Sequence, residues 1–259
     1  MESLALSHGP LTFTDEGPGQ APALLALHGI PGSVRTFRYL APQVTGHVRL
    51  VRVNLPGFGG SAPSADAVVS LDGRSRVLVA LADHLGLERF AVLGHSLGGG
   101  CALVLAANEP TRVNGLVLLA SVGLRPHRGL AMSPRGARLI GRAFAVPLVK
   151  HALVRMARER YKRRHFPGAD ELDAKAFAVH FKAIGATDFE QLRRAARSPL
   201  PRTLIAWARD DHMVENEIPE ELARALPAAR TLVFEAGGHN IQKTQAVALG
   251  TAIRATLGS

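Results

Sequence analysis

Short apolar runs alternate with longer amphipathic stretches along the 259 residues of the chain. Runs of four or five apolar residues, bounded by Gly, Pro, Asn or Asp, are typical of parallel strands that are covered on both faces. Such runs lie at 24–27, 50–53, 90–93, 116–120, 203–206 and 231–234. Helical periodicity predicts helices over 71–85, 97–108, 217–226 and 244–257. Strand–helix alternation of this kind predicts an α/β fold with an open, mostly parallel, doubly wound sheet.

Two segments depart from this alternation. The first 20 residues are rich in Gly and Pro and contain strand-like pieces at 4–7 and 11–14, which predicts a leading antiparallel hairpin. Residues 121–201 contain helical patterns and prolines but no clear strand, and a βα crossover does not need such a length. We therefore expect a core domain made of residues 1–121 and 202–259. An inserted helical cap, residues 122–201, precedes the last strands and is called the cap segment below.

The composition narrows the class of protein. A hydrophobic content of 47% and a charged content of 20% are those of a globular domain and exclude a disordered chain. The one cysteine, Cys101, excludes an internal disulfide framework and a cysteine-based zinc cluster, and we expect it to pack in the core. No metal or cofactor is expected. No apolar run is long enough to span a bilayer and no secretory leader is readable, so we expect a cytoplasmic protein.

The net charge of +10 is concentrated in one part of the cap segment. Residues 125–164 hold 12 Lys and Arg against one acid, Glu159, and the rest of the chain is nearly neutral. Since no zinc-finger spacing, RNA-binding aromatic motif or heptad repeat accompanies the charge, we do not expect nucleic acid as a partner. Apolar positions recur every three or four residues over 139–157, between arginines, which predicts a buried apolar stripe and a charged outer face. That face is expected to be solvated, and weak contact with an anionic surface remains open.

The clearest candidate for chemistry is a G-x-S-x-G motif at 94–98. It follows the predicted strand 90–93 and opens the predicted helix 97–108. A serine on so tight a strand-to-helix turn needs small neighbours two residues to either side, and these are Gly94 and Gly98. The turn lifts the Ser96 hydroxyl clear of the sheet, at the positive end of the helix. This context predicts that Ser96 is a nucleophile.

The chain resembles the α/β-hydrolase fold superfamily, and within it the serine esterases and lipases that carry an inserted helical cap. Residues 28–33 resemble the oxyanion-hole loop of that family, and 53–61 resemble the turn after its next strand, although Asn54 stands where Asp is more common. Residues 206–214 and 237–239 resemble the acid loop and the histidine loop. The resemblance covers nearly the whole chain outside the cap segment, and the order Ser, acid, His is the one expected for this fold.

The resemblance implies a catalytic triad of Ser96, Asp211 and His239. A serine hydroxyl needs a base, and His239 follows the last predicted strand in a Gly-Gly turn. The base in turn needs a carboxylate to fix its tautomer. Asp211 lies three residues before Val214, which fits the D-x-x-V pattern of the family, and its neighbour Asp210 is then a loop cap or a solvated charge.

The resemblance also implies an oxyanion hole made of backbone N–H groups. One donor belongs to Leu97, the residue after the nucleophile, and the other to Ile30. His28 and Gly29 are expected to shape the supporting loop. Some large apolar residues of the cap segment are expected to line an acyl pocket; the candidates are Met132, Phe144, Met156, Tyr161, Phe166, Phe177 and Phe181.

The function that follows is hydrolysis of a small carboxylic ester through an acyl-enzyme, with short to medium acyl or aryl substrates expected. Lactones and thioesters remain open because they need the same triad, and a slow-turnover ligand receptor on the same fold is a second alternative. Epoxide hydrolases and haloalkane dehalogenases use an aspartate nucleophile, and this chain has Ser96. Carbon–carbon bond hydrolases usually carry His-Trp where this chain has His239-Asn240. The protein is expected to be a monomer or a homodimer.

Overall fold

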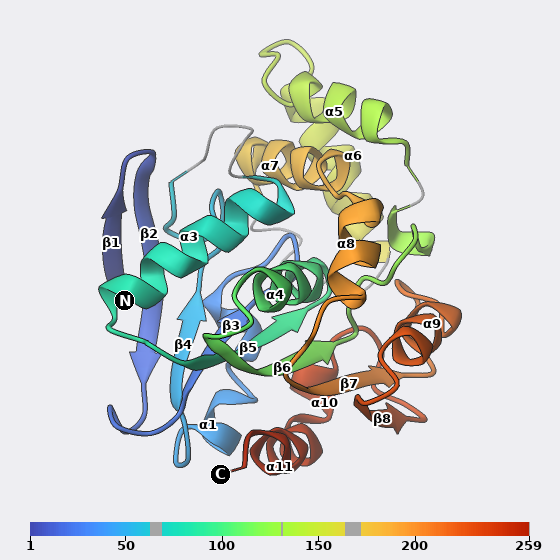
Figure 1. Cartoon of the computed structure of the whole chain (residues 1–259). Coiled ribbons are helices and arrows are strands. Elements are labelled where there is room, and N and C mark those ends of the chain that lie inside the picture. The colour runs from blue at the N-terminus through green and yellow to red at the C-terminus, as the bar shows by residue number, and fades with distance from the viewer. Residues whose placement is uncertain (63–68, 131, 164–171, 259) are drawn as a thin grey trace.

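An eight-stranded sheet with the order β1-β2-β4-β3-β5-β6-β7-β8 forms the centre of the computed structural model, which describes residues 1–62, 69–130, 132–163 and 172–258 (Figure 1). β1 pairs with β2 and β2 with β4 in antiparallel register, and the remaining neighbours are parallel. The strands are β1 Glu2–Leu6, β2 Gly9–Glu16, β3 Ala23–Leu27, β4 Arg49–Val53, β5 Phe90–His95, β6 Val113–Leu119, β7 Arg202–Ala208 and β8 Arg230–Phe234. The predicted α/β class, the hairpin and the parallel strands are confirmed.

The sheet separates two hydrophobic cores because its strands are apolar on both faces. Successive side chains of a strand point to opposite faces. Leu25 and Leu27 of β3 therefore belong to the core under α3 and α4, whereas Leu24 and Ala26 belong to the core under α1 and α11. Figure 1 shows α3 and α4 in front of the sheet and α1 and α11 below it. Near-continuous apolar runs were thus the correct signal of a doubly covered sheet.

Most of the predicted helices are confirmed within a residue or two. The helices are α1 Ala41–Val44, α3 Leu71–His84, α4 Leu97–Asn108, α5 Pro134–Ala143, α6 Lys150–Arg163, α7 Ala174–Gly185, α8 Phe189–Ala196, α9 Glu217–Ala225, α10 Ile241–Thr244 and α11 Ala246–Leu257, with short 3₁₀ turns η1 Val34–Phe37 and η2 Arg128–Leu130. The single helix predicted over 244–257 is wrong at its start. Gln245 leaves the helical region, with φ −122° and ψ 27°, and its side chain donates a hydrogen bond to the carbonyl oxygen of Ala236 at 2.7 Å.

Helices α5 to α8 lie between β6 and β7, and no strand occurs among the residues described there. Phe144, at the end of α5, stacks on Phe177 and Phe181 of α7, with ring centroids 5.4 and 5.6 Å apart. These contacts join α5 to α7, which lies between α5 and the sheet in Figure 1.

The buried apolar stripe predicted over 139–157 is largely absent. None of the residues described in α6 is buried, and the side chains of Leu139, Leu148 and Met156 are 70%, 93% and 66% exposed. Helical spacing does not by itself supply a second layer: α5 lies on the side of α7 away from the sheet in Figure 1, and most of the apolar positions over 139–157 stay partly or fully exposed. None of the described helices has the length and apolar character that a membrane span requires.

Candidate active site

The turn from β5 into α4 holds Ser96 in a strained conformation. Its φ of 54° and ψ of −124° lie outside the regions that non-glycine residues prefer. A Cβ atom on Gly94 would lie 2.2 Å from the carbonyl oxygen of Gly98, and one on Gly98 would lie 2.3 Å from that of Leu27. Because these contacts are with backbone atoms, which cannot move aside as a side chain can, both positions require glycine, as the sequence predicted.

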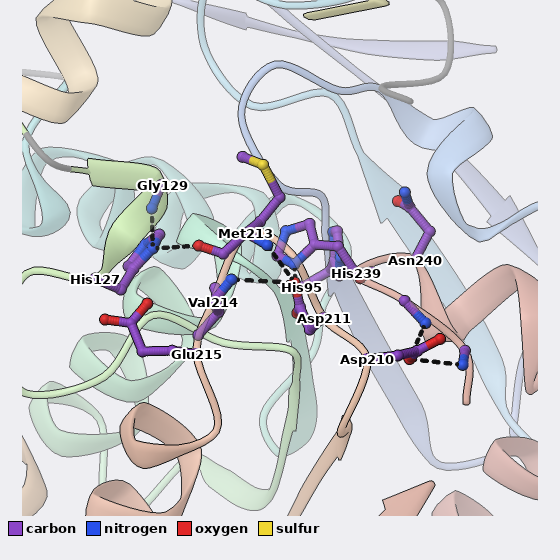
Figure 2. Close-up of polar contacts among 12 residues, drawn as sticks. His95, His127, Gly129, Asp210, Asp211, Met213, Val214, Glu215, His239 and Asn240 are labelled. Carbon is purple, nitrogen blue, oxygen red and sulfur yellow. Dashed lines mark hydrogen bonds and ion pairs between the residues drawn. The ribbon is translucent and has the colours of Figure 1, made fainter. Parts of the chain in front are cut away.

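Asp211 and His239 lie in direct contact, although 28 positions separate them (Figure 2). The His239 ring donates from Nδ1 to Asp211 Oδ2 at 2.8 Å. The other carboxylate oxygen, Oδ1, accepts hydrogen bonds from the backbone N–H groups of Met213 and Val214 at 2.7 and 3.0 Å. With Nδ1 as the donor, the Nε2 atom of His239 is left as the acceptor that a general base needs.

The environment keeps Asp211 ionised in spite of its burial. The residue is 7% exposed, and burial alone would raise the pKa of its carboxyl. The hydrogen bond from His239, the electrostatic interaction with that ring, and the N–H groups of Val214 and Met213 outweigh the effect of burial and hold the pKa of the Asp211 carboxyl below its usual value. A buried carboxylate of this kind is suited to stabilise an imidazolium.

Asp210 has a different task, which Figure 2 makes visible. Its Oδ1 atom accepts hydrogen bonds from the backbone N–H groups of Gly237 and Gly238 at 2.9 and 2.7 Å, and these bonds lower its pKa. Asp210 thus caps the turn that leads into His239 and does not touch the imidazole. Of the two roles left open for it by the sequence, the loop cap is the one observed.

Sequence reasoning did not identify His95, whose ring contacts His239. The His95 ring donates from Nε2 to the backbone carbonyl of His239 at 2.9 Å, and the two ring centroids are 4.9 Å apart. Burial lowers the pKa of His95 to about 3, so the ring is neutral at physiological pH. No local pattern signals this contact, because 144 residues separate the partners.

Two further histidines of the cap segment reach the same site. His127 donates from Nδ1 to the carbonyl of Met213 at 3.0 Å, which ties the start of the cap segment to the acid loop. His180 of α7 forms a short hydrogen bond with the Tyr161 hydroxyl of α6. Burial lowers the pKa of both histidines to about 4. Neither carries a carboxylate partner among the described residues, which distinguishes both from His239.

The loop after β3 passes directly beside Ser96. A Cβ atom on Gly29 would lie 2.8 Å from the Cβ of Ser96. His28 is fully buried, donates from Nδ1 to the carbonyl of Gly29 at 2.6 Å, and accepts at Nε2 the N–H of Leu55 at 3.0 Å. Burial lowers its pKa to about 4. Leu97 is the first residue of α4, where a backbone N–H has no partner within the helix.

A pocket of about 610 Å³ joins these parts, and Ser96, Leu97, Ile30 and His239 all line it. The volume is ordinary for a small-molecule site. Of the apolar residues expected to line an acyl pocket, Tyr161 does so, whereas the phenylalanines of α5 and α7 stack on each other. Phe166 lies outside the described residues. No group of three or more His, Cys, Asp or Glu residues in the described ranges is arranged to hold a metal ion.

The comparisons with known proteins agree on the fold. The family profile described as alpha/beta hydrolase fold matches residues 22–246. A dihydrolipoyllysine-residue acetyltransferase component of an acetoin cleaving system from Pseudomonas putida is 31% identical over 87% of this chain, which spans 60% of that protein's length. The magnesium-chelatase 30 kDa subunit of Rhodobacter capsulatus is 32% identical over 92% of this chain and 88% of its own.

Proteins named for hydrolysis also match. A 2-hydroxy-6-oxononadienedioate/2-hydroxy-6-oxononatrienedioate hydrolase from Cupriavidus pinatubonensis is 27% identical over 95% of this chain and 89% of its own. The crystal structure of an enol-lactonase from Burkholderia xenovorans superimposes over the full length of both chains with a TM-score of 0.80 at 20% identity, a likeness of fold.

Proposed function

Since the chain belongs to the alpha/beta hydrolase fold family, we propose that it is a serine hydrolase that cleaves carboxylic esters. Ser96 is the nucleophile, His239 the general base and Asp211 the carboxylate that orients it. The observation that carries the proposal is the 2.8 Å hydrogen bond between His239 and Asp211 in a pocket that Ser96 lines. Among the histidines of that pocket, His239 is the one that faces a carboxylate.

In the first half of the reaction, Ser96 Oγ attacks the ester carbonyl while His239 Nε2 takes its proton. The backbone N–H groups of Leu97 and Ile30 stabilise the negative oxygen of the tetrahedral intermediate. As the intermediate collapses, His239 returns the proton to the departing alcohol. In the second half His239 activates water, which releases the acid and restores Ser96.

The proton transfer requires a hydrogen bond between the Ser96 hydroxyl and the ring of His239, and the structure does not contain one. Catalytic hydrogen bonds of this kind are often long without substrate and tighten in the Michaelis complex. The neighbouring contacts hold the two partners close to each other. His95 holds the backbone of His239, and Gly29 keeps the opposite wall within van der Waals distance of Ser96.

The cap segment, residues 122–201, is proposed to form the wall that selects substrates. Tyr161, His180 and Ile184 come from this segment and line the same pocket as Ser96. Their position above the carboxyl edge of the sheet supports a role in recognition and leaves the bond-breaking step to the core domain.

The residues of the site also bear on which other reactions of the family this chain could catalyse. A dehalogenase or an epoxide hydrolase needs an aspartate where Ser96 lies, which disfavours both. Lactones and thioesters are attacked by the same triad, so they remain alternatives within the proposal. The histidine that follows the last strand has Asn240 as its neighbour, and this departs from the His-Trp pair usual in carbon–carbon bond hydrolases.

Covalent labelling tests the nucleophile. The wild-type protein should react with a fluorophosphonate and release 4-nitrophenol steadily from 4-nitrophenyl esters, and Ser96→Ala should do neither while keeping its circular dichroism spectrum. Ser198→Ala, a change at a serine outside the pocket, is the matched control and should behave as wild type. Labelling that persists in Ser96→Ala would exclude Ser96 as the nucleophile. Labelling without turnover would favour a ligand receptor.

A further inference from the structure

The pocket is lined by an excess of positive charge. Among the lining residues that the structure describes, four are Lys or Arg, namely Arg35, Arg38, Lys175 and Lys243, and Asp173 is the one carboxylate. All four cations are exposed, and none forms an ion pair within the described part of the chain. They come from η1, α7 and α10, so segments far apart in the sequence bring them to the same opening. Cationic side chains around one cleft focus the field into it.

Two of these cations are held in place by an aromatic ring. The guanidinium carbon of Arg38 lies 4.5 Å from the ring centroid of Tyr39, and Lys243 Nζ lies 5.9 Å from the same centroid. Arg38 also donates to the Tyr39 hydroxyl at 3.3 Å and to the carbonyl of Arg35 at 3.5 Å. The hydrogen bond from Arg38, and then the charges of Arg38 and Lys243, lower the pKa of Tyr39. The ring thus gathers two cations on the core side of the opening, and we call Arg38, Tyr39 and Lys243 the basic rim.

The opposite wall adds to this field and does not cancel it. Asp173 is the N-cap of α7, where its Oδ1 accepts the N–H of Ala176 at 2.7 Å, so its charge is opposed by the positive end of that helix. Lys175 follows two residues later. Arg74 does not line the pocket, but it is fully buried beside the Cys101 thiol, no carboxylate pairs with it among the described residues, and its charge acts on His28 and on the pocket residue His180. A cation in such a low-dielectric position acts over a longer range than one in water.

We propose that the natural substrate is an anion: an ester or lactone that carries a free carboxylate, which the basic rim binds while the reacting carbonyl lies at Ser96. Arg38 and Lys243 contact the carboxylate, and Arg35 and Lys175 contribute field. The inference rests on the proposed function, because it names the substrate class of the same site. The observation behind it is that, among the described residues, these four exposed cations line the cleft of Ser96 and His239 and have no carboxylate partner of their own.

Two esters that differ in one charge test this proposal. Mono-4-nitrophenyl adipate and 4-nitrophenyl hexanoate share the leaving group and the number of acyl carbons, and only the adipate carries a carboxylate. The ratio of their kcat/KM values, adipate over hexanoate, should be at least about tenfold at low ionic strength. It should fall several-fold when the salt concentration rises from about 20 to about 500 mM, because exposed charges are screened over that range.

Variants locate the effect. Arg38→Gln/Lys243→Gln should lower the ratio by about tenfold, and Arg224→Gln, which removes an exposed arginine of α9 outside the pocket, should leave the ratio within about twofold. A ratio of one or less in the wild type would overturn the proposal. So would a ratio that the double variant and Arg224→Gln change equally.

A binding measurement keeps the inference separate from the chemistry. The stable 4-nitroanilides of adipic and hexanoic acid can be titrated into Ser96→Ala by calorimetry. Tighter binding of the adipic anilide would support the anionic site, provided that adding Arg38→Gln/Lys243→Gln to Ser96→Ala abolishes the difference. This result would stand even if the wild type hydrolysed neither ester, and such a lack of hydrolysis would refute the proposed function alone. Equal binding of the two anilides would refute the anionic site alone.

Discussion

Asp210 and Asp211 are neighbours with nearly the same chemistry, and their exchange for asparagine should have very different consequences. Asp211 touches the imidazole of His239 at 2.8 Å, whereas Asp210 touches the backbone of Gly237 and Gly238. The pair therefore isolates the effect of a carboxylate on the imidazole from the effect of a carboxylate on the loop.

The magnitude for Asp211 follows from the hydrogen bonds that it makes. In Asp211→Asn, the amide oxygen can keep the N–H groups of Met213 and Val214, and the amide nitrogen then faces His239 Nδ1. His239 Nδ1 must then accept a hydrogen bond from the amide, so the ring proton moves to Nε2. In the proposed mechanism Nε2 is the atom that receives the proton of Ser96, and it can no longer do so. A wrong tautomer of this kind lowers turnover by about 10⁴ in well-studied triads, or about 5.5 kcal/mol of transition-state stabilisation.

Asp210→Asn should cost less than about threefold, because the amide oxygen still accepts both glycine N–H groups. Asp210→Ala removes both hydrogen bonds, but the site is exposed and water replaces the lost acceptor, so about fivefold is expected. The assay is kcat/KM for a 4-nitrophenyl ester, with the thermal unfolding midpoint of each variant as a control for folding. If Asp210→Asn proves more damaging than Asp211→Asn, the assignment of Asp211 to the triad is wrong.

Three further predictions follow from the described contacts. Burial lowers the pKa of His28 from 6.5 to about 4, so the unfolded chain binds a proton that the folded chain does not, and His28 should contribute about 3 kcal/mol to the loss of unfolding free energy between pH 6.5 and 4. The buried His95, His127 and His180 add to the same loss, so urea titrations of His28→Gln should show a loss that is smaller than that of the wild type by about the His28 share. Gly98→Ala places a methyl group against backbone carbonyl oxygens at 2.3 and 2.5 Å, so its unfolding midpoint should drop by several degrees, and an unchanged midpoint would contradict the geometry. The triple change Arg155→Glu/Arg160→Glu/Arg163→Glu, called the cap variant, reverses three exposed charges of α6. Its turnover of a neutral ester should differ from that of the wild type by less than about tenfold and should depend little on salt. Loss of turnover in a folded cap variant would place this face in the active site.

The cap variant leaves Arg158 unchanged for a structural reason. The Nε–H of Arg158 donates to the carbonyl of Leu172 at 2.9 Å and so joins α6 to the start of α7. Its reversal would test the packing of the cap segment along with its charge. Lys162 is also kept, because it pairs with Glu159 on the same helix at 3.6 Å.

The sequence alone determined the sheet and the turn that carries Ser96, because both depend on neighbours along the chain. A near-continuous apolar run marks a strand that is covered on both faces, and this holds for β3 and β5. The glycines beside Ser96 are dictated by steric contact within one tight turn, so the motif and the structure give the same answer. The contact between Asp211 and His239 was also predictable, but only because the family resemblance supplied the order of the loops.

Tertiary structure decided what depends on segments that meet only after folding. His95 contacts the backbone of His239 because β5 ends at the same sheet edge as the last strands, and His127 and His180 arrive there from the cap segment. The apolar positions of α6 have helical spacing, yet spacing cannot show whether a second layer covers them, and here none of the described residues of α6 is buried. The basic rim has no sequence signature either. Arg38 follows η1 directly and Lys243 lies in α10, and only the folded chain brings both to the ring of Tyr39 at one opening.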